Sequence, residues 1–370
     1  MPCWIPWCAA ESPPRETIPS ADSKLNIFVK HRKQIERLCK IVEAFPRLTV
    51  TVLADLVADE FVFGEISRVS REAPVLILKH RERTVVPGGG ANAVYNLADL
   101  GVTVLPVGVV GDDEPGRLLL QCFRQKKIST TGIVRLKDHT TVTKTRILAG
   151  GTHSSRQQVV RVDREPEEQP DDSAQMKLLY NARQYARISD AVLCSDYGYG
   201  AATPELLARL RSSTIPITLD SRYRTLAYSG VTAATPNEEE LEEVLGTRIG
   251  DDSARLFATG KAVMQKMKLQ SLLVTRGKDG MVVFSRGNKP VVIPIYGSDE
   301  VADVTGAGDT VIAVFTLALA CGAAPEAAAR LANYAGGIVV MKRGTATVTC
   351  DELRNAVESE IRSQKPEASD

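Results

Sequence analysis

Short apolar runs alternate with longer amphipathic segments along most of the chain. The apolar runs are rich in β-branched residues and lie at 48–55, 102–111, 190–196, 215–220 and 271–277. Such runs are typical of strands buried on both faces of a sheet. Helical patterns lie between them, at 91–101, 115–127, 174–188, 204–213, 238–246 and 255–269. This order predicts an α/β fold with a largely parallel sheet and helices on both faces.

Two segments interrupt the alternation. Residues from about 60 to 88 and from about 139 to 165 contain short runs with alternating polar positions and no helix between them. This pattern is typical of a small antiparallel sheet. We expect these strands, inserted into the parallel core, to form a lid.

The remaining pattern predicts one domain over residues 47–360. We expect residues 1–46 to form a partly disordered tail and a leading helix, and residues 361–370 a disordered tail. The first residues contain prolines but neither a basic segment nor a continuous apolar one, so they do not match a secretory signal. At 370 residues the chain can bury a full core.

Charge and composition narrow the possible functions. Lysine and arginine number 46 against 45 aspartate and glutamate residues, so no nucleic-acid partner is indicated. The seven cysteines are scattered without a C-x-x-C pair, which favours reduced thiols in a cytoplasmic protein. The four histidines show no metal-ligand spacing. The most apolar segment, 311–321, is about half the length of a membrane span, and we interpret it as a core helix.

The candidate chemistry lies just before that helix, in "DVTGAGDTVIAVF" (303–315). Ligands of open α/β sheets bind where strands end and helices begin. Glycines there let backbone N–H groups approach an anion, and the helix adds its positive dipole end. Asp309 could then accept a proton from an attacking hydroxyl. The alternative is structural: Gly306 and Gly308 form a turn and Asp309 caps the helix.

The segment "DVTGAGDT" (303–310) resembles the carboxy-terminal signature of ribokinase/PfkB-type sugar kinases, and "VPGGGANAVYNLADLG" (86–101) resembles their amino-terminal glycine signature. The likeness extends over roughly 47–350. Seven further blocks are similar to the D-glycero-heptose 7-phosphate kinases, in many bacteria the amino-terminal half of a bifunctional ADP-heptose synthesis enzyme: "SRVSREAPV", "TKTRIL", "QQVVRVDRE", "LCSDYGYG", "TPNEEELEEVLG", "LLVTRGKDGM" and "KRGTATV". The resemblance implies a ribokinase-like three-layer α/β/α core with a β-sheet lid.

The resemblance also implies roles at the transfer and sugar sites. Asp309 would be the catalytic base, and Gly306, Ala307 and Gly308 would form the anion hole. Asp59 would bind sugar hydroxyls, with Asp55 as the alternative candidate. The sugar face would also include Gly88, Gly89 and Asn92, although the two glycines could simply form a tight strand-to-helix turn.

For the nucleotide, the resemblance implies that Asn237 and Glu240 organise Mg²⁺, through water, on ATP. The same spacing also fits a helix capping box, and both interpretations can hold together. Thr275, Gly277 and Asn333 would lie near the ribose and adenine, although Asn333 could instead be a packed polar residue. Asp303 would order the glycine loop or help to hold a monovalent cation such as K⁺, or act only as a turn carboxylate.

An acceptor that already carries a phosphate needs a second cationic site. The candidates are basic residues on the lid side: Arg68, Lys144, Arg146 and Arg161. Because neighbours along a strand alternate sides, we expect Lys144 and Arg146 to share one face. That face could alternatively be merely solvated.

The chain departs from the heptose kinases at two places. Ala54 stands where they commonly have glycine, and Asp220, Ser221 and Arg222 replace a common Asp-Pro-Lys. These departures put contacts to nucleotide or sugar there in question. The chain shows no H-x-G-H nucleotidyl-transfer motif and no second domain after residue 360, so we expect a stand-alone kinase.

The resemblance thus implies an ATP- and Mg²⁺-dependent sugar kinase that acts on the anomeric hydroxyl of D-glycero-D-manno-heptose 7-phosphate to give the 1,7-bisphosphate. The alternatives are a kinase for another sugar, sugar phosphate or nucleoside, and a non-catalytic sugar-binding regulator. An oxidoreductase is disfavoured because no G-x-G-x-x-G follows an early strand. The expected partner is a small molecule rather than nucleic acid or membrane. The resemblance suggests a homodimer formed through the lid, whose strand edges need covering.

Overall fold

The predicted apolar runs form the centre of a nine-stranded sheet. The structure, a computed structural model, describes residues 21–150, 157–210, 214–297, 303–342 and 344–363. In spatial order the strands of this sheet are β13 (Val291–Ile293), β12 (Met281–Ser285), β11 (Ser271–Thr275), β10 (Ala233–Ala234), β9 (Ile217–Ser221), β8 (Ala191–Asp196), β1 (Thr49–Ala54), β4 (Thr103–Gly111) and β5 (Ile133–Leu136). Neighbouring strands from β5 to β11 are parallel, whereas β12 and β13 are antiparallel additions at one edge.

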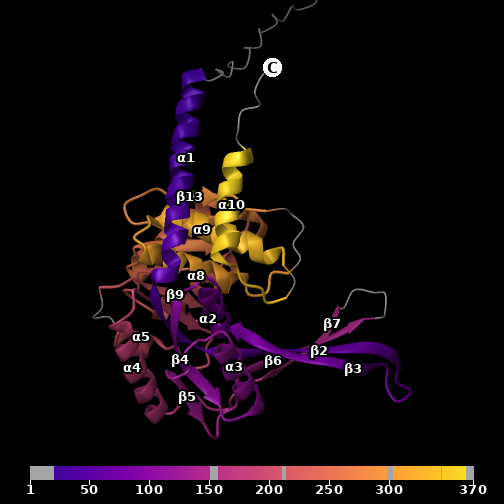
Figure 1. The fold of residues 1–370 in the computed structure, drawn as a ribbon. Helices are drawn as coiled ribbons and strands as arrows, with labels where there is room; N and C mark the ends of the chain where they lie inside the picture. The colour runs from indigo at the N-terminus through magenta and orange to yellow at the C-terminus, as the bar shows by residue number, and fades with distance from the viewer. Residues whose placement is uncertain (1–20, 151–156, 211–213, 298–302, 343, 364–370) are drawn as a thin grey trace, which may run out of the picture.

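Helices cover both faces of this sheet, as the alternating pattern predicts (Figure 1). One face carries α1 (Ala21–Ala44), α2 (Gly90–Asp99), α3 (Glu114–Gln125), α8 (Ala307–Ala320), α9 (Pro325–Val340) and α10 (Cys350–Ser363). The other carries α4 (Asp172–Ala186), α5 (Pro204–Ala208), α6 (Glu238–Leu245) and α7 (Ser253–Met267). Helix α8 is apolar nearly all round and lies in the core. The prediction of a largely parallel sheet between two helical layers is therefore confirmed.

A second sheet extends away from this core in Figure 1. Its order is β3 (Leu76–Gly89), β2 (Leu56–Val69), β6 (Thr143–Gly150) and β7 (Gln157–Arg164). The sheet is mixed rather than purely antiparallel, because β2 pairs in parallel with β6. The reason is topological: the chain passes through β4, α3 and β5 before it returns to this sheet. Strand β2 follows β1 with only Asp55 between them, so the second sheet starts beside the carboxyl end of a core strand.

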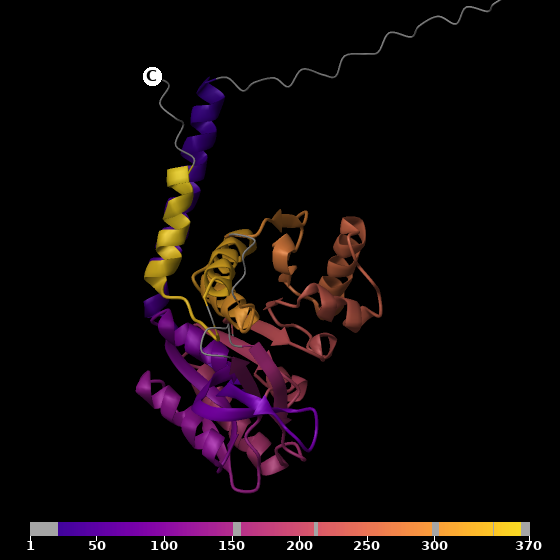
Figure 2. The same cartoon turned by 90° about the vertical axis from the view of Figure 1, so that its right-hand side faces the viewer.

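The first and last helices lie side by side and project from the core (Figures 1 and 2). Within the part of α1 whose side chains are described, Ile35, Leu38 and Val42 are buried in the core on one side of the helix. Leu353 and Val357 of α10 belong to the same apolar cluster. Across the described residues, no helix combines the length and apolarity that a membrane span requires.

Candidate active site

Two cavities meet at Asp309, where strands of the large sheet end beside the start of the second sheet, which we call the lid. The smaller cavity, of about 140 Å³, lies on the side of the lid, and we call it the acceptor cavity. The larger one, of about 490 Å³, lies toward α6, and we call it the transfer cavity. Both are lined by Tyr197, Arg222, Thr305, Gly306 and Asp309.

The carboxylate of Asp309 lies in the first turn of α8 and is only 4% exposed. Its two oxygens accept one hydrogen bond each, Oδ2 from Nδ2 of Asn92 (2.9 Å) and Oδ1 from the hydroxyl of Tyr197 (3.1 Å). Burial raises the pKa of Asp309 to about 7, although these two hydrogen bonds oppose the shift. A carboxyl group with a pKa close to neutrality suits a general base.

The glycine loop in front of α8 is shaped by close contacts. Gly306 has a φ of 79°, and a Cβ at this position would lie 2.4 Å from Nδ2 of Asn92. A Cβ at Gly308 would meet nothing within 4 Å, because this residue borders the transfer cavity. Ala307 is the first residue of α8. The loop therefore presents the amino end of a long helix to the cavity, which favours an anion there.

Asp303 lies just before this loop and ties it to a second loop. Its Oδ1 accepts from the backbone N–H of Thr305 (2.9 Å), and its Oδ2 accepts from that of Gly344 (3.2 Å). It does not line either cavity. Of the roles considered for Asp303, ordering the loop has direct contacts in its support.

A buried chain of hydrogen bonds stands behind Asn92. Asn96 uses its amino group to donate to the backbone carbonyl and Oδ1 of Asn92 (3.0 and 3.3 Å) and accepts from the hydroxyl of Thr310 (2.7 Å). The backbone carbonyl of Asn92 can only accept a hydrogen bond, so the group of Asn96 that faces it must be the amino group. The same amino group also faces Oδ1 of Asn92. The amino group of Asn92 must then face Asp309. Sequence reasoning missed Asn96 and Thr310; the only signal was polar residues on the inner face of two apolar helices.

The sugar-side residues of the sequence prediction meet in the acceptor cavity. Asp59 is 4% exposed, and its Oδ1 accepts from the guanidinium of Arg146 (2.8 Å). A Cβ at Gly88 would lie 2.4 Å from the carboxyl carbon of Asp59, so only glycine fits beside it. Gly89 and Lys144 also line the cavity. Burial lowers the pKa of Lys144, and the nearby Arg222 adds to that effect.

The other two basic candidates do not reach this cavity. Arg68 is exposed on the outer part of β2. Arg161 lies opposite Arg146 in the sheet, but its guanidinium is half exposed and forms an ion pair with Asp163 (2.8 Å). Lys144 and Arg146 do share a face, as their spacing predicts.

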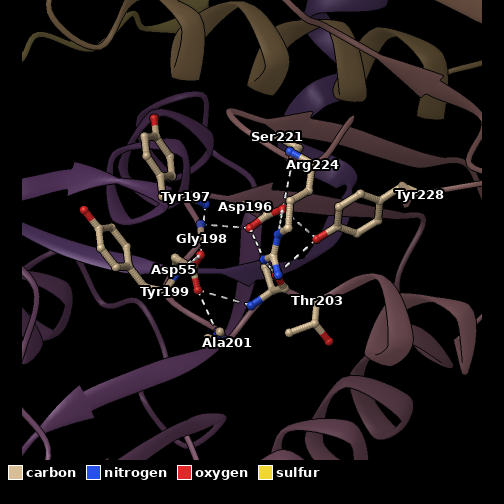
Figure 3. A network of polar contacts seen from close by, with 12 residues as sticks. Asp55, Asp196, Tyr197, Gly198, Tyr199, Ala201, Thr203, Ser221, Arg224 and Tyr228 are labelled. Atoms are coloured by element: carbon tan, nitrogen blue, oxygen red, sulfur yellow. Dashed lines mark hydrogen bonds and ion pairs between the residues drawn. The ribbon is translucent and has the colours of Figure 1, made fainter. Parts of the chain in front are cut away.

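Asp55 is placed differently from Asp59, although only three residues separate them. Its carboxylate is 1% exposed and does not line the acceptor cavity. Instead it accepts four backbone N–H groups of the loop that follows β8 (Figure 3). These contacts favour Asp59 over Asp55 for sugar binding.

The transfer cavity is bordered by oxygen-bearing side chains. Asn237 and Glu240 form the capping box of α6, with Oδ1 of Asn237 accepting from N–H of Glu240 (2.7 Å) and Oε2 of Glu240 accepting from N–H of Asn237 (2.9 Å). Asp220 lines the same cavity, and burial raises its pKa well above the ordinary value. Nowhere in the described residues do three His, Cys, Asp or Glu side chains cluster closely enough to hold a metal by themselves.

A third, mostly apolar hollow of about 190 Å³ continues from the glycine loop. Thr275, Gly277, Val304, Gly308 and Asn333 are among the residues that line it. Nδ2 of Asn333 donates to the carbonyl of Pro294 (2.8 Å), so this amide both packs in the core and borders the hollow. The nucleotide candidates of the sequence prediction thus lie along one continuous surface.

The two departures from the heptose kinases have local explanations. Ala54 is fully buried, and its methyl group fits because residue 90 is glycine: a Cβ there would lie 2.6 Å from it. The hydroxyl of Ser221 donates to Asp196 (2.9 Å) in a buried network, and Arg222 reaches both cavities. Arg222 and Tyr197 are functional candidates that sequence reasoning did not assign, although both lie within blocks that it singled out.

Two buried hydroxyls at the cavities are unsatisfied. Within the part of the chain that is described, no group hydrogen-bonds Oγ1 of Thr345 or of Thr235. Thr345 lines the acceptor cavity and Thr235 the transfer cavity. Buried polar atoms normally have partners, so these two are suited to ligand atoms.

This fold and this site define a ribokinase-like sugar kinase. Similar solved structures include *Arabidopsis thaliana* ribokinase complexed with ribose and ATP (TM-score 0.64, 19% identity, 85% of this chain and 99% of that one). Phosphofructokinase-2 of *Escherichia coli* in complex with substrates and products is also similar (TM-score 0.69, 17% identity, 84% and 99%). The predicted fold is confirmed by these likenesses.

The chain belongs to the pfkB family of carbohydrate kinases, whose family model matches residues 57–352. A relative named bifunctional protein HldE from *Geobacter sulfurreducens* is 39% identical over 327 residues, which cover 87% of this chain and 65% of that protein. HldE of *Caulobacter* sp. is 39% identical, covering 86% and 64%. The chain therefore matches about two thirds of the length of these relatives. The predicted family and the class of sugar kinase are confirmed.

Proposed function

We propose that the protein transfers the γ-phosphoryl group of ATP to the anomeric hydroxyl of D-glycero-D-manno-heptose 7-phosphate, giving the 1,7-bisphosphate and ADP. The observation that carries this proposal is the position of Asp309 between two cavities, one with a basic pair at its lid side and one with a helix amino terminus. The similarity to HldE proteins supports the choice of acceptor.

The chemistry follows from that position. Ionised Asp309 takes the proton of the anomeric hydroxyl while the oxygen attacks the γ-phosphorus, and the bond to the bridging oxygen of ADP breaks. The N–H groups at Gly306–Gly308 stabilise charge on the transferring group. Arg222 borders both cavities, and it adds positive charge on the path between them.

On the acceptor side, Asp59, Asn92, Gly88 and Gly89 bind the sugar, and Lys144 with Arg146 binds its 7-phosphate. One oxygen of Asp59 is occupied by Arg146, while Oδ2 has no partner among the described residues and is available to a hydroxyl. Arginine suits a bidentate contact with phosphate, and lysine adds a point charge.

On the nucleotide side, Asn237, Glu240 and the neighbouring Asp220 fit a hydrated Mg²⁺, because oxygen ligands border the cavity and too few converge to strip the ion of water. The ion would supply positive charge to the nucleotide phosphates when bound. Thr275, Gly277 and Asn333 border the apolar hollow that suits ribose and adenine. We also propose a K⁺ dependence at the Asp303 loop, since phosphofructokinase-2 of *Escherichia coli* has been solved in complex with potassium.

The second sheet supports a homodimer. Its β7 strand exposes Val159, Val160 and Val162 by 45–48%, and β7 is an edge of the sheet. Exposed apolar edges favour pairing with another chain. A Val160→Lys, Val162→Lys variant should then be monomeric by light scattering, whereas a monomeric wild-type protein would contradict the proposal.

The test of the proposed function is ADP release with magnesium-ATP across a panel of acceptors: heptose 7-phosphate, the unphosphorylated heptose, fructose 6-phosphate, fructose 1-phosphate, ribose and nucleosides. We expect a strong preference for heptose 7-phosphate. Preference for another acceptor would keep the kinase chemistry and discard the acceptor assignment. If no acceptor in the panel causes ADP release but sugar binding is retained, the result would favour the non-catalytic alternative.

A further inference from the structure

Asp55 holds a loop by its backbone. The loop runs from Tyr197 to Ala202, directly after β8. Oδ2 of Asp55 accepts from the N–H groups of Tyr197 and Tyr199 (both 2.9 Å), and Oδ1 accepts from those of Ala201 and Ala202 (2.8 and 3.2 Å) (Figure 3). All four donors are main-chain groups, so the contact specifies the path of the loop rather than any side chain.

A second buried carboxylate fixes the start of the same loop. Asp196 ends β8, is 1% exposed, and accepts from N–H of Gly198 (2.9 Å). It also accepts from the hydroxyls of Ser221 and Tyr228 (both 2.9 Å) and forms an ion pair with Arg224. Figure 3 shows both carboxylates with their hydrogen bonds to the loop. The loop is thus held by two anchors: Asp55 lines neither cavity, and Asp196 borders only the transfer cavity.

The anchored loop carries one side chain into the site. The hydroxyl of Tyr197 donates to Oδ1 of Asp309 (3.1 Å), and the ring borders both cavities. Nζ of Lys144 lies 5.5 Å from the centre of that ring. A small shift of the loop would therefore withdraw one of the two hydrogen bonds that hold the base.

We propose that Asp55 is a positioning residue of the kinase: it fixes the backbone of the Tyr197–Ala202 loop and so holds the hydroxyl of Tyr197 against Asp309. This inference rests on the proposed role of Asp309 as the base, and not on the identity of the acceptor. It assigns Asp55 a function other than sugar binding.

The direction in which the pKa of Asp309 changes when Asp55 is substituted distinguishes a positioning role of Asp55 from a direct electrostatic one. The charged and titratable groups that line the two cavities with Asp309 come from five segments of the chain: Asp59, Lys144 and Arg146, Asp196 and Tyr197, Asp220 and Arg222, and Glu240. A hydrogen bond from Tyr197 to the ionised carboxylate lowers the pKa of Asp309, so its loss raises that pKa. Removal of a negative charge at Asp55 would act directly in the opposite direction and lower it.

The experiment is a ¹³C NMR titration of the aspartate carboxyl carbons in the full-length protein, with the Asp309 signal assigned by its loss in Asp309→Asn. We expect Tyr197→Phe to raise the pKa of Asp309 by about one unit. Asp55→Asn should raise it as well, because the amide keeps one acceptor oxygen and turns an amino group toward the other N–H donors. In the double variant the pKa should not rise above that of Tyr197→Phe alone, because the hydrogen bond that Asp55 positions is already absent.

A matched control uses Asp113, a partly buried carboxylate that caps α3 and accepts from N–H of Gly116 and Thr141 (2.9 and 2.8 Å). Asp113→Asn makes the same chemical change away from Asp309 and should leave its pKa unchanged. An unchanged or lowered pKa in Asp55→Asn, or a further rise when Asp55→Asn is added to Tyr197→Phe, would overturn the proposal. The titration needs no substrate, so a wrong acceptor assignment would not affect it.

Discussion

The core side and the lid side of the site differ in the chemistry of their residues. On the core side, Asp309 is surrounded by glycines, amides and the amino end of α8, and its hydrogen-bond partners are themselves fixed by buried groups. On the lid side, Lys144 and Arg146 are charged side chains on a sheet that extends away from the core. Neutral hydrogen-bond donors that are held rigidly can stabilise a transition state. Charged side chains on an extending sheet can instead discriminate between ligands. We infer that the core performs phosphoryl transfer and the lid selects the acceptor.

The largest effect is expected at Asp309, the proposed base. Asp309→Asn keeps the shape of the side chain but removes its ability to take a proton, so kcat should fall by about 10²–10⁴-fold. The KM for either substrate should change little, because the cavities remain. Steady-state ADP release measures both constants. Unchanged turnover in this variant would contradict the role of Asp309.

The glycine loop offers a comparison of function with stability. In Gly308→Ala the methyl group projects into the transfer cavity and contacts no other protein atom, so the melting temperature should stay close to the wild-type value. Because the methyl group occupies space that the transferring phosphoryl group needs, kcat should fall by about 10²-fold. Gly306→Ala should lower both, because of the positive φ and the contact with Asn92. Turnover assays and thermal unfolding on the two variants check this contrast. Equal loss of stability in both would count against the open space at Gly308.

On the lid side, Lys144→Met and Arg146→Met should each raise the KM for a phosphorylated acceptor by about 10–100-fold, since each removes one charged hydrogen-bond donor. The matched control is Arg161→Met, which alters a half-exposed arginine on the same sheet outside the acceptor cavity. It should leave KM unchanged. A similar rise in Arg161→Met would mean that the sheet acts through its overall charge.

The last expected effect is on the pH dependence of stability rather than on turnover. The pKa of Asp309 is raised to about 7 in the folded protein, so between about pH 4 and 7 the folded state binds more protons than the unfolded state. This group's contribution to stability is therefore present at acidic pH and is lost as the pH rises to 7. Asp309→Asn should be more stable than wild type above pH 7 by on the order of 2–4 kcal/mol, with no gain at pH 4. Denaturant unfolding at the two pH values tests the sign.

The sequence was informative where periodicity and glycine spacing carry the signal. Parallel strands, covering helices and the loop before α8 could all be predicted, because apolar runs and glycines act locally. The difference between the contacts of Asp55 and those of Asp59 could not be predicted. Both are aspartates near the end of one strand, and only the path of a loop more than 140 residues later shows which one is occupied by backbone N–H groups.

The same limit applies to Asn96 and Tyr197. Each acts through a hydrogen bond that joins distant segments, such as the contact of Asn96 with Thr310, and single-sequence patterns contain no signal for such pairs. Arg68 and Arg161 show the converse. Their charge made them candidates for the acceptor phosphate, but strand register places Arg68 on the outer part of the lid, and Arg161 forms an ion pair with Asp163, two residues along the same strand.

The most direct test of the division between core and lid is the ratio of kcat/KM for heptose 7-phosphate to that for the unphosphorylated heptose, measured in the wild type and in Lys144→Met, Arg146→Met. We predict a high ratio in the wild type that collapses toward one in the double variant, because kcat/KM for the phosphorylated sugar falls much further than that for the unphosphorylated sugar. A ratio that survives the double substitution, or an equal loss of kcat with both sugars, would show that the lid does not select the acceptor through these two residues.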